Sequence, residues 1–165
     1  MASVLKADSW QDSNGNVIKT IINSYSHRWL DQTTTSSLTY IDVIGSSFIY
    51  TPIRSNSILM IQGEVSISPY NTTNNYTGQN YAIFVNGLEQ GKQINNHEVY
   101  VSVGTAGPSD LYIGKMVKTA LFTVTSLTPL TINIKTRVYN TANVLGRINQ
   151  GNQWDSYIHV WEIAQ

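Results

Sequence analysis

The segment LTINIKTRVY, residues 130–139, alternates between apolar and polar side chains along its length. Ile132, Ile134 and Val138 occupy one set of positions, and the residues between them are polar. Successive side chains of a β-strand point to opposite faces, so a period of two indicates a strand with one buried face. This segment therefore predicts a strand that covers a core on one side and meets solvent on the other.

The same alternation recurs through the rest of the chain. LMIQGEVSI places Leu59, Ile61, Val65 and Ile67 on one face, and no run shows the period of an amphipathic helix of three turns. The other segments with strand character are residues 38–43, 48–50, 80–87, 97–104, 118–126 and 157–163. Even spacing with Gly, Pro and Asn between strands favours two packed sheets. We predict an all-β fold, an antiparallel β-sandwich of jelly-roll type over residues 31–165.

Charge is sparse and balanced in this chain. Ten Lys and Arg residues match ten Asp and Glu residues, whereas Ser, Thr, Asn and Gln together number 59. Such a balance gives no field that attracts nucleic acid or an anionic membrane, so we expect neither as a partner. There is no cysteine, and no run resembles a signal peptide or a membrane span. The composition is typical of proteins that function outside cells or pack against copies of themselves.

The first thirty residues form a different kind of segment. Asn14-Gly15 is a strong signal for a tight turn and lies between two short strand-like runs, 4–10 and 17–22. An isolated hairpin is marginally stable in water, so this extended arm or hairpin needs a surface to dock on. We interpret residues 1–30 as an arm that attaches the protein to a larger particle. The residues expected to make this attachment are Val4, Leu5, Trp10, Val17, Ile18, Ile21 and Ile22. The alternative is that the hairpin folds back and covers its own sandwich.

The last strand, SYIHVWEIAQ at residues 156–165, has apolar side chains on both faces. A sheet in a sandwich usually has one buried face, so a strand of this kind indicates a second cover. That cover is either a long loop of the same chain or a neighbouring subunit. In the second case Tyr157, His159, Trp161 and Ile163 form the subunit interface.

Signals for catalysis are absent from the sequence. There is no nucleophile elbow, phosphate-binding loop, dinucleotide-binding motif or zinc-protease motif, and the three histidines lack metal-ligand spacing. Asp110 and Asp155 are the two acids in turn-like regions that could act as a pair, and we interpret them as solvated turn residues. We therefore expect no enzymatic activity, no metal and no cofactor.

A saccharide contact is the alternative function that the sequence suggests. The loop YNTTNNYTGQN, residues 70–80, combines aromatic rings with amides, which together can hold the face of a sugar. Tyr70, Asn74 and Tyr76 would make this contact. The Asn-x-Thr sequons at Asn71 and Asn75 are simple consequences of the same Asn- and Thr-rich composition.

Three parts of the chain, namely the start, a middle block and the end, resemble a group of virion proteins. VLKADSWQDSNGNVI at residues 4–18 resembles the short leader LKVD-x-I-Q-(D/N)-x-x-G of tail-fibre-like virion proteins of cyanobacterial and marine bacteriophages. TYIDV and IYTPIRSNSILMIQGEVSIS, at residues 39–43 and 49–68, resemble the group's Y-x-D and I-T-P-x-S-x-S-K-I-L blocks, and SYIHVWEIAQ resembles its terminal E-I-A strand.

The resemblance implies a structural protein of the bacteriophage virion, made in the host cytoplasm and assembled on the particle surface. It further implies a homotrimer whose N-terminal arm docks on other virion structural proteins of the capsid or tail. Two roles fit this description. The protein would be a capsid decoration (cement) protein or a component of a short tail fibre or adaptor, with a host-surface saccharide-binding module as the alternative.

Overall fold

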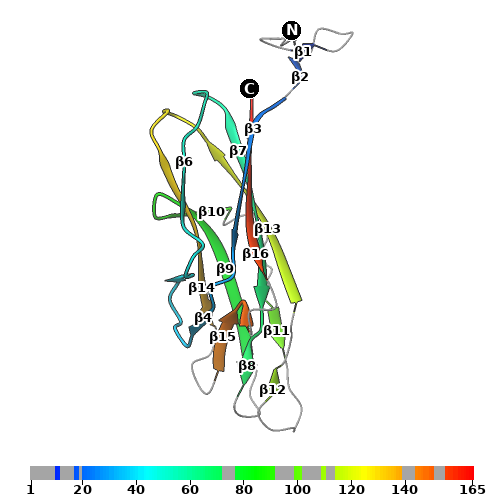
Figure 1. Cartoon of the computed structure of the whole chain (residues 1–165), viewed down its shortest axis with the longest axis vertical. Helices are drawn as coiled ribbons and strands as arrows, with labels where there is room; N and C mark the ends of the chain where they lie inside the picture. The colour runs from blue at the N-terminus through cyan, green and yellow to red at the C-terminus, as the bar shows by residue number, and fades with distance from the viewer. Residues whose placement is uncertain are drawn as a thin grey trace.

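A computed structural model describes residues 10–11, 17–18, 20–71, 77–91, 99–101, 109–110, 114–138, 144–150 and 155–165. These residues form two large antiparallel sheets and a two-stranded hairpin, with essentially no helix (Figure 1). The predicted all-β sandwich is thereby confirmed. Val4, Leu5, Asn74 and Tyr76 lie outside the described residues, and only the backbone is described for Trp10, Val17 and Ile18.

The larger sheet is built on four long strands. In spatial order they are β3 (Ile21–Trp29), β16 (Ser156–Ile163), β7 (Ile58–Ile67) and β13 (Gly114–Thr123). Shorter strands extend one end of this sheet: β15 (Val144–Ile148), β4 (Thr33–Thr35), β8 (Tyr70–Asn71) and β12 (Ser109–Asp110). The first and last long strands of the sandwich therefore pair with each other.

The smaller sheet is built around β14 (Leu130–Val138), which pairs with β9 (Thr77–Val85). The opposite edge of β14 pairs with β5 (Ile41–Asp42) and β6 (Phe48–Tyr50), and β9 pairs with β10 (Leu88–Gln90) and β11 (Val99–Val101). Asn86 and Gly87, with φ values of 50° and 78°, make the two-residue turn from β9 to β10. Asn and Gly accept positive φ at low cost, which explains why this pair ends the strand.

The core lies between the inward faces of the two sheets. Leu59, Ile61 and Val65 of β7 and Ile132 and Ile134 of β14 are fully buried, as their alternation predicts. Tyr81 of β9 crosses this core, and its hydroxyl lies 2.7 Å from the carbonyl oxygen of Gly63 and 3.0 Å from that of Met116. Burial raises the pKa of Tyr81, so this phenol stays protonated and joins the two sheets.

Two segments differ from the sequence-based expectation. Ile21–Trp29, within the range assigned to the attachment arm, pairs along β16 and belongs to the larger sheet. The strand β15 (Val144–Ile148) falls outside the segments that the sequence predicts as strands. Ahead of β3, β1 (Trp10–Gln11) pairs with β2 (Val17–Ile18) in a two-residue antiparallel ladder, and Asn14-Gly15 lies outside the described residues. This hairpin lies beyond the end of the sandwich at which β16 finishes (Figure 1).

Gly146 in β15 provides a stability prediction. A Cβ atom at this position would lie 2.8 Å from Val138 Cγ1 and 3.0 Å from Gln79 Cδ, both of which belong to buried residues of the smaller sheet. Gly146→Ala should therefore lower the free energy of unfolding by about 1–3 kcal/mol, the usual cost of overpacking a core. Urea denaturation measures this change. Ser24→Ala, at an exposed strand position, is the control, and equal stability of both variants would contradict the close packing.

Candidate functional site

The residues expected to form a subunit interface lie on the outward side of the larger sheet, across its four long strands. Along β16, Ser156, Ile158, Val160 and Glu162 are buried, and the intervening side chains are only partly covered. The partly covered residues are Tyr157, His159, Trp161 and Ile163. The outward side chains of β3, β16, β7 and β13 are called here the β16 face. All four predicted interface residues lie on this face.

Three ring systems form a row along the centre of the β16 face. The Tyr157 and His159 rings are 5.7 Å apart and inclined by 7°, and the His159 and Trp161 rings are 5.6 Å apart and inclined by 29°. The Nδ1 atom of His159 lies 2.7 Å from the hydroxyl of Ser26 on the neighbouring strand. Stacking and this hydrogen bond fix the rings, so the row presents a flat, pre-formed surface.

Aliphatic side chains continue this surface across the sheet. Met60 is the cross-strand partner of Trp161 on one side and of Leu121 on the other. Leu121 and Val117, both pointing outward from β13, are 52% and 50% exposed. Large apolar side chains that are half exposed and contiguous mark surfaces at which proteins associate.

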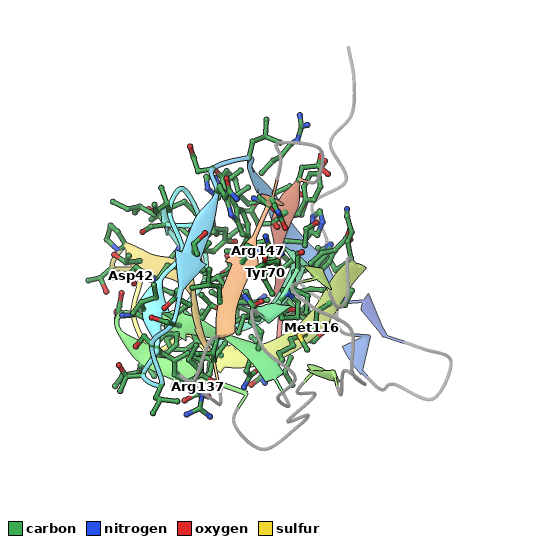
Figure 2. All side chains as sticks on the ribbon, turned by 90° about the horizontal axis from the view of Figure 1, so that it is seen from below. Asp42, Tyr70, Met116, Arg137 and Arg147 are labelled. Carbon is green, nitrogen blue, oxygen red and sulfur yellow. The ribbon has the colours of Figure 1, made fainter. Side chains whose placement is uncertain are left out.

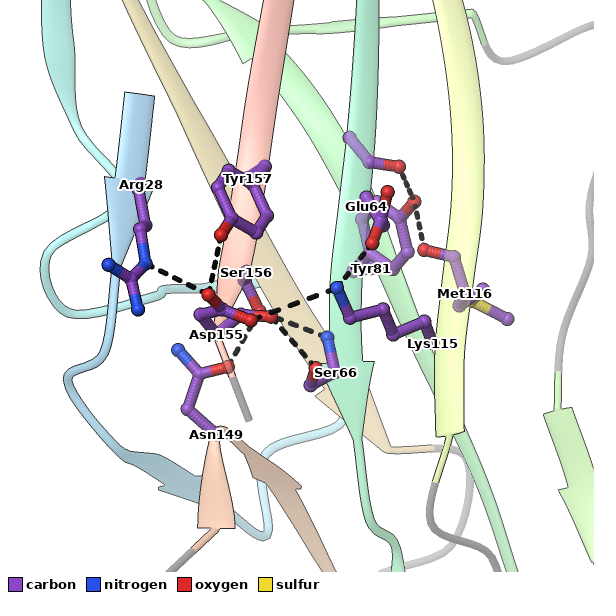
Figure 3. Close-up of polar contacts among 11 residues, drawn as sticks. Arg28, Glu64, Ser66, Tyr81, Lys115, Met116, Asn149, Asp155, Ser156 and Tyr157 are labelled. Carbon is purple, nitrogen blue, oxygen red and sulfur yellow. Dashed lines mark hydrogen bonds and ion pairs between the residues drawn. The ribbon is translucent and has the colours of Figure 1, made fainter. Parts of the chain in front are cut away.

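One end of the β16 face is charged but internally neutralised (Figure 3). Asp155 Oδ2 accepts hydrogen bonds from Arg28 Nε at 2.9 Å and from the Tyr157 hydroxyl at 2.5 Å. Lys115 lies between the two acids: its Nζ atom contacts the Glu64 carboxylate and is 3.8 Å from Asp155 Oδ1. Two cations thus balance two anions. This end of the face can therefore orient a partner that binds there, although it carries no net charge.

This network gives Asp155 a role other than the solvated turn residue we expected. The hydrogen bond from Tyr157 lowers the pKa of Asp155, burial opposes this effect, and Arg28 and Lys115 lower the pKa further. An acid held ionised in this way cannot donate a proton at neutral pH. The other acid considered, Asp110, pairs with Tyr70 through its backbone, and its side chain is not described. The structure therefore does not show the two acids forming a site.

Behind the β16 face, the carboxylate of Glu162 is fully buried and accepts hydrogen bonds from four groups. The Tyr50 hydroxyl donates to Oε2 at 2.9 Å, and the backbone N–H groups of Ile53 and Arg54 approach within 3.0 and 2.9 Å. The Ser57 hydroxyl completes the set at 2.7 Å. A buried charge is tolerated when its hydrogen bonds are satisfied, and here they fix the segment that leads into β7.

These donors also determine the ionisation of Glu162. Burial by itself raises the pKa of this carboxyl, but the hydrogen bonds from Ile53, Ser57, Arg54 and Tyr50 together lower the pKa below its usual value. Burial and the hydrogen bond to Glu162 raise the pKa of Tyr50, so its hydroxyl stays protonated and remains a hydrogen-bond donor. Glu162 is therefore an ionised structural anchor, a role that its place in the sequence alternation did not reveal.

Of the three residues expected to contact a saccharide, Tyr70 lies in the described part of the chain, and Asn74 and Tyr76 do not. The guanidinium of Arg147 lies 4.5 Å above the ring of Tyr70, and the two side chains meet in Figure 2. One face of the ring is therefore already occupied by a cation, which leaves at most the other face for a sugar.

Two of the three histidines lie in the described part of the chain, on opposite sides of the larger sheet. His27 Nε2 lies 2.7 Å from the carbonyl oxygen of Gly45, on the inner side of β3, whereas His159 lies on the outer face. Among the described residues, no group of three or more His, Cys, Asp or Glu side chains could hold a metal ion. Within the same residues, there is no helix with the length and hydrophobicity needed to span a membrane. Comparison with protein-family models and with the sequences of curated proteins finds no match to this chain.

Replacing the buried carboxylate gives a prediction with a defined pH dependence. Glu162→Gln puts an NH₂ donor among groups that already donate, so it should lower the free energy of unfolding at neutral pH by about 1.5–3 kcal/mol. Because the pKa of Glu162 is lowered in the folded protein, its stabilisation is complete above the ordinary carboxyl pKa of 4.5. It disappears as the pH falls through the folded-state value.

Urea denaturation of both proteins at neutral pH and in acid tests this assignment. The difference between wild type and Glu162→Gln should shrink on acidification. Glu64→Gln, at a partly exposed carboxylate of the same sheet, is the control and should change stability by about 1 kcal/mol or less. A Glu162→Gln difference that does not depend on pH would show that the carboxylate is not ionised in the folded protein.

Proposed function

We propose that this chain is a structural protein of the bacteriophage virion surface that assembles with copies of itself through the β16 face. The observation that carries the proposal is the combination of the aromatic row at Tyr157, His159 and Trp161 with half-exposed Val117 and Leu121. The similarity of three segments to tail-fibre-like virion proteins supports the location on a virion. A role as a capsid decoration protein or as a tail-fibre or adaptor component is compatible with this assembly.

The order of strands supports the finer description of the fold as a jelly roll. The long strands after β3 alternate between the two sheets along the chain: β7, β13 and β16 in the larger sheet, β9 and β14 in the smaller one. The first strand also lies beside the last. Crossing between sheets at successive connections is the arrangement of two Greek keys.

The residues ahead of β3 are proposed as the attachment segment. The β1–β2 hairpin has a short ladder and lies beyond the end of the sandwich. A ribbon of this kind has free strand edges that a partner chain can extend. The attachment residues Ile21 and Ile22 lie at the start of β3, where Ile21 is 56% exposed, so they continue this surface onto the sandwich.

We propose that self-association through the β16 face gives a homotrimer, the number of subunits being the one that the resemblance to virion proteins implies. Light scattering coupled to gel filtration should give three times 18.4 kDa. Leu121→Arg places a charge in the β16 face at an exposed position and should convert the trimer to monomer, because an unpaired charge is costly to bury. Trp161→Ala should weaken the trimer as well.

A matched control exists on the other sheet. Leu88 is 69% exposed on β10, so Leu88→Arg adds the same charge outside the β16 face and should leave the trimer intact. A wild-type monomer at micromolar concentration would contradict the proposed assembly, and so would equal loss of the trimer in both arginine variants.

Attachment is tested by a chain that begins at Thr20. This truncation removes the hairpin and keeps β3, whose loss would expose the edge of β16. The shortened protein should fold and trimerise but fail to join particles that lack the protein. Trp10→Ala should weaken joining, since truncating a docked aromatic side chain costs about 2–4 kcal/mol, and should leave the melting temperature unchanged. If the shortened chain joins particles normally, attachment must involve other residues. If it aggregates, the hairpin is needed to cover the sandwich.

A further inference from the structure

A recess of about 430 Å³ opens on the outer side of the smaller sheet, away from the β16 face. Thr131, Asn133 and Lys135 line it from the outward side of β14, and Asp42, Ser47 and Gly87 line it from neighbouring segments. Its volume falls within the range of small-molecule binding sites. Val43, a buried core residue, also contributes to the lining, and none of the lining residues belongs to the β16 face.

The polar groups of the recess are held in fixed positions. Asn133 is nine-tenths buried, and its Nδ2 atom donates to Asp42 Oδ1 at 2.7 Å. Lys135 Nζ lies 3.2 Å from the same oxygen and 5.0 Å from the centre of the Phe84 ring. Asp42 Oδ2 accepts no hydrogen bond from the described part of the chain, and the side chain is 70% exposed. A carboxylate is thus oriented through one oxygen and offers the other to solvent.

We infer that this recess binds a neutral saccharide. Vicinal hydroxyl groups both donate and accept hydrogen bonds, and the recess presents the matching set: Asp42 as acceptor, Lys135 as donor and Asn133 as both. The hydroxyls of Ser47 and Thr131 add two groups that can act in either direction. The single ammonium is balanced by the single carboxylate, so the site has no net charge to select a phosphate, a sulfate or a polyamine.

One wall of the recess is held in place by hydrogen bonds, and an exposed apolar side chain lies beside it. Asn86 and Thr131 exchange two hydrogen bonds of 2.8 Å, which fix the turn that carries Gly87. A Cβ atom at Gly87 would meet nothing within 4 Å, so the turn leaves the opening clear. Ile49, the cross-strand partner of Thr131, is 70% exposed on the same side of the sheet. Such an aliphatic side chain can pack against the C–H face of a sugar ring.

This site is distinct from residues 70–76 and does not depend on the proposed assembly. Asp42 and Tyr70 come from different sheets and are well separated in Figure 2. Association through the β16 face would leave the smaller sheet uncovered, so each copy in an assembly would present one recess. A shallow polar site of low affinity gains avidity from several linked copies.

The test combines a printed glycan array with saturation-transfer NMR on the full chain, using glucose, galactose, mannose and N-acetylglucosamine as probes. We expect wild type to bind neutral glycans. Asp42→Ala should bind at least roughly tenfold more weakly, the effect of losing one hydrogen bond to a charged group. Asp42→Ala also removes the acceptor of the buried Asn133 amide, so its melting temperature should fall, and binding is compared at a temperature at which the variant stays folded. Glu89→Ala removes a carboxylate of the same sheet that does not line the recess and should bind as wild type does.

Three results would overturn the assignment. They are the absence of binding to any neutral probe, unchanged binding by Asp42→Ala, and binding restricted to acidic glycans. The trimer mass and particle joining are measured separately from glycan binding. If no saccharide binds, the proposed structural role is unaffected. If the structural role is wrong, the saccharide site is unaffected.

Discussion

The buried carboxylate of Glu162 ties the last strand of the chain to the segment that crosses from one sheet to the other. Tyr50 ends β6 in the smaller sheet, Ser57 precedes β7 in the larger one, and both donate to the same side chain on β16. The carboxylate thus sets the position of β16 beside β7 and of the crossing segment above it. Two segments that lie far apart in the sequence meet at this carboxylate, since IYTPIRSNS supplies the donors and WEIAQ supplies the acceptor.

Strands that bury a regular apolar face could be predicted from the sequence, and strands with other inner faces could not. β7 and β14 alternate cleanly because Leu, Ile and Val fill their inward positions. β3 has Asn23, Tyr25 and His27 on its inner side, where they contact Tyr50, Phe48 and Gly45, so apolar alternation does not identify it. In β15 the close approach of Val138 requires a glycine at position 146, and glycine weakens any strand signal.

The candidate surfaces also differ in how far they could be predicted from the sequence. The aromatic row consists of every second residue of one strand, so it could be predicted from the sequence alone. The network at its end joins residues from β3, β7 and β13 to Asp155 beside β16, and the recess joins Asp42 to Asn133 and Lys135 across a strand pair. Those groupings depend on register between distant segments, which periodicity does not provide. Asn133 is an example. From the sequence, an amide on the outward face of a strand is expected to be solvated, and its burial against Asp42 becomes evident only from the structure.

The pairing of β3 with β16 also determines how the sandwich would respond to force. The hydrogen bond from Ala164 N to Thr20 O, 3.0 Å long, joins the two strands at the end of the sandwich where the hairpin leaves. Tension between the two ends of the chain would break this bond first and then open the ladder one rung at a time, which requires little force. Tension between the hairpin and a body held at the β16 face runs along β3 instead. Inter-strand hydrogen bonds lie perpendicular to the strands, so the whole ladder resists that sliding motion together. A protein held at its N-terminal end is therefore loaded in its mechanically strongest direction.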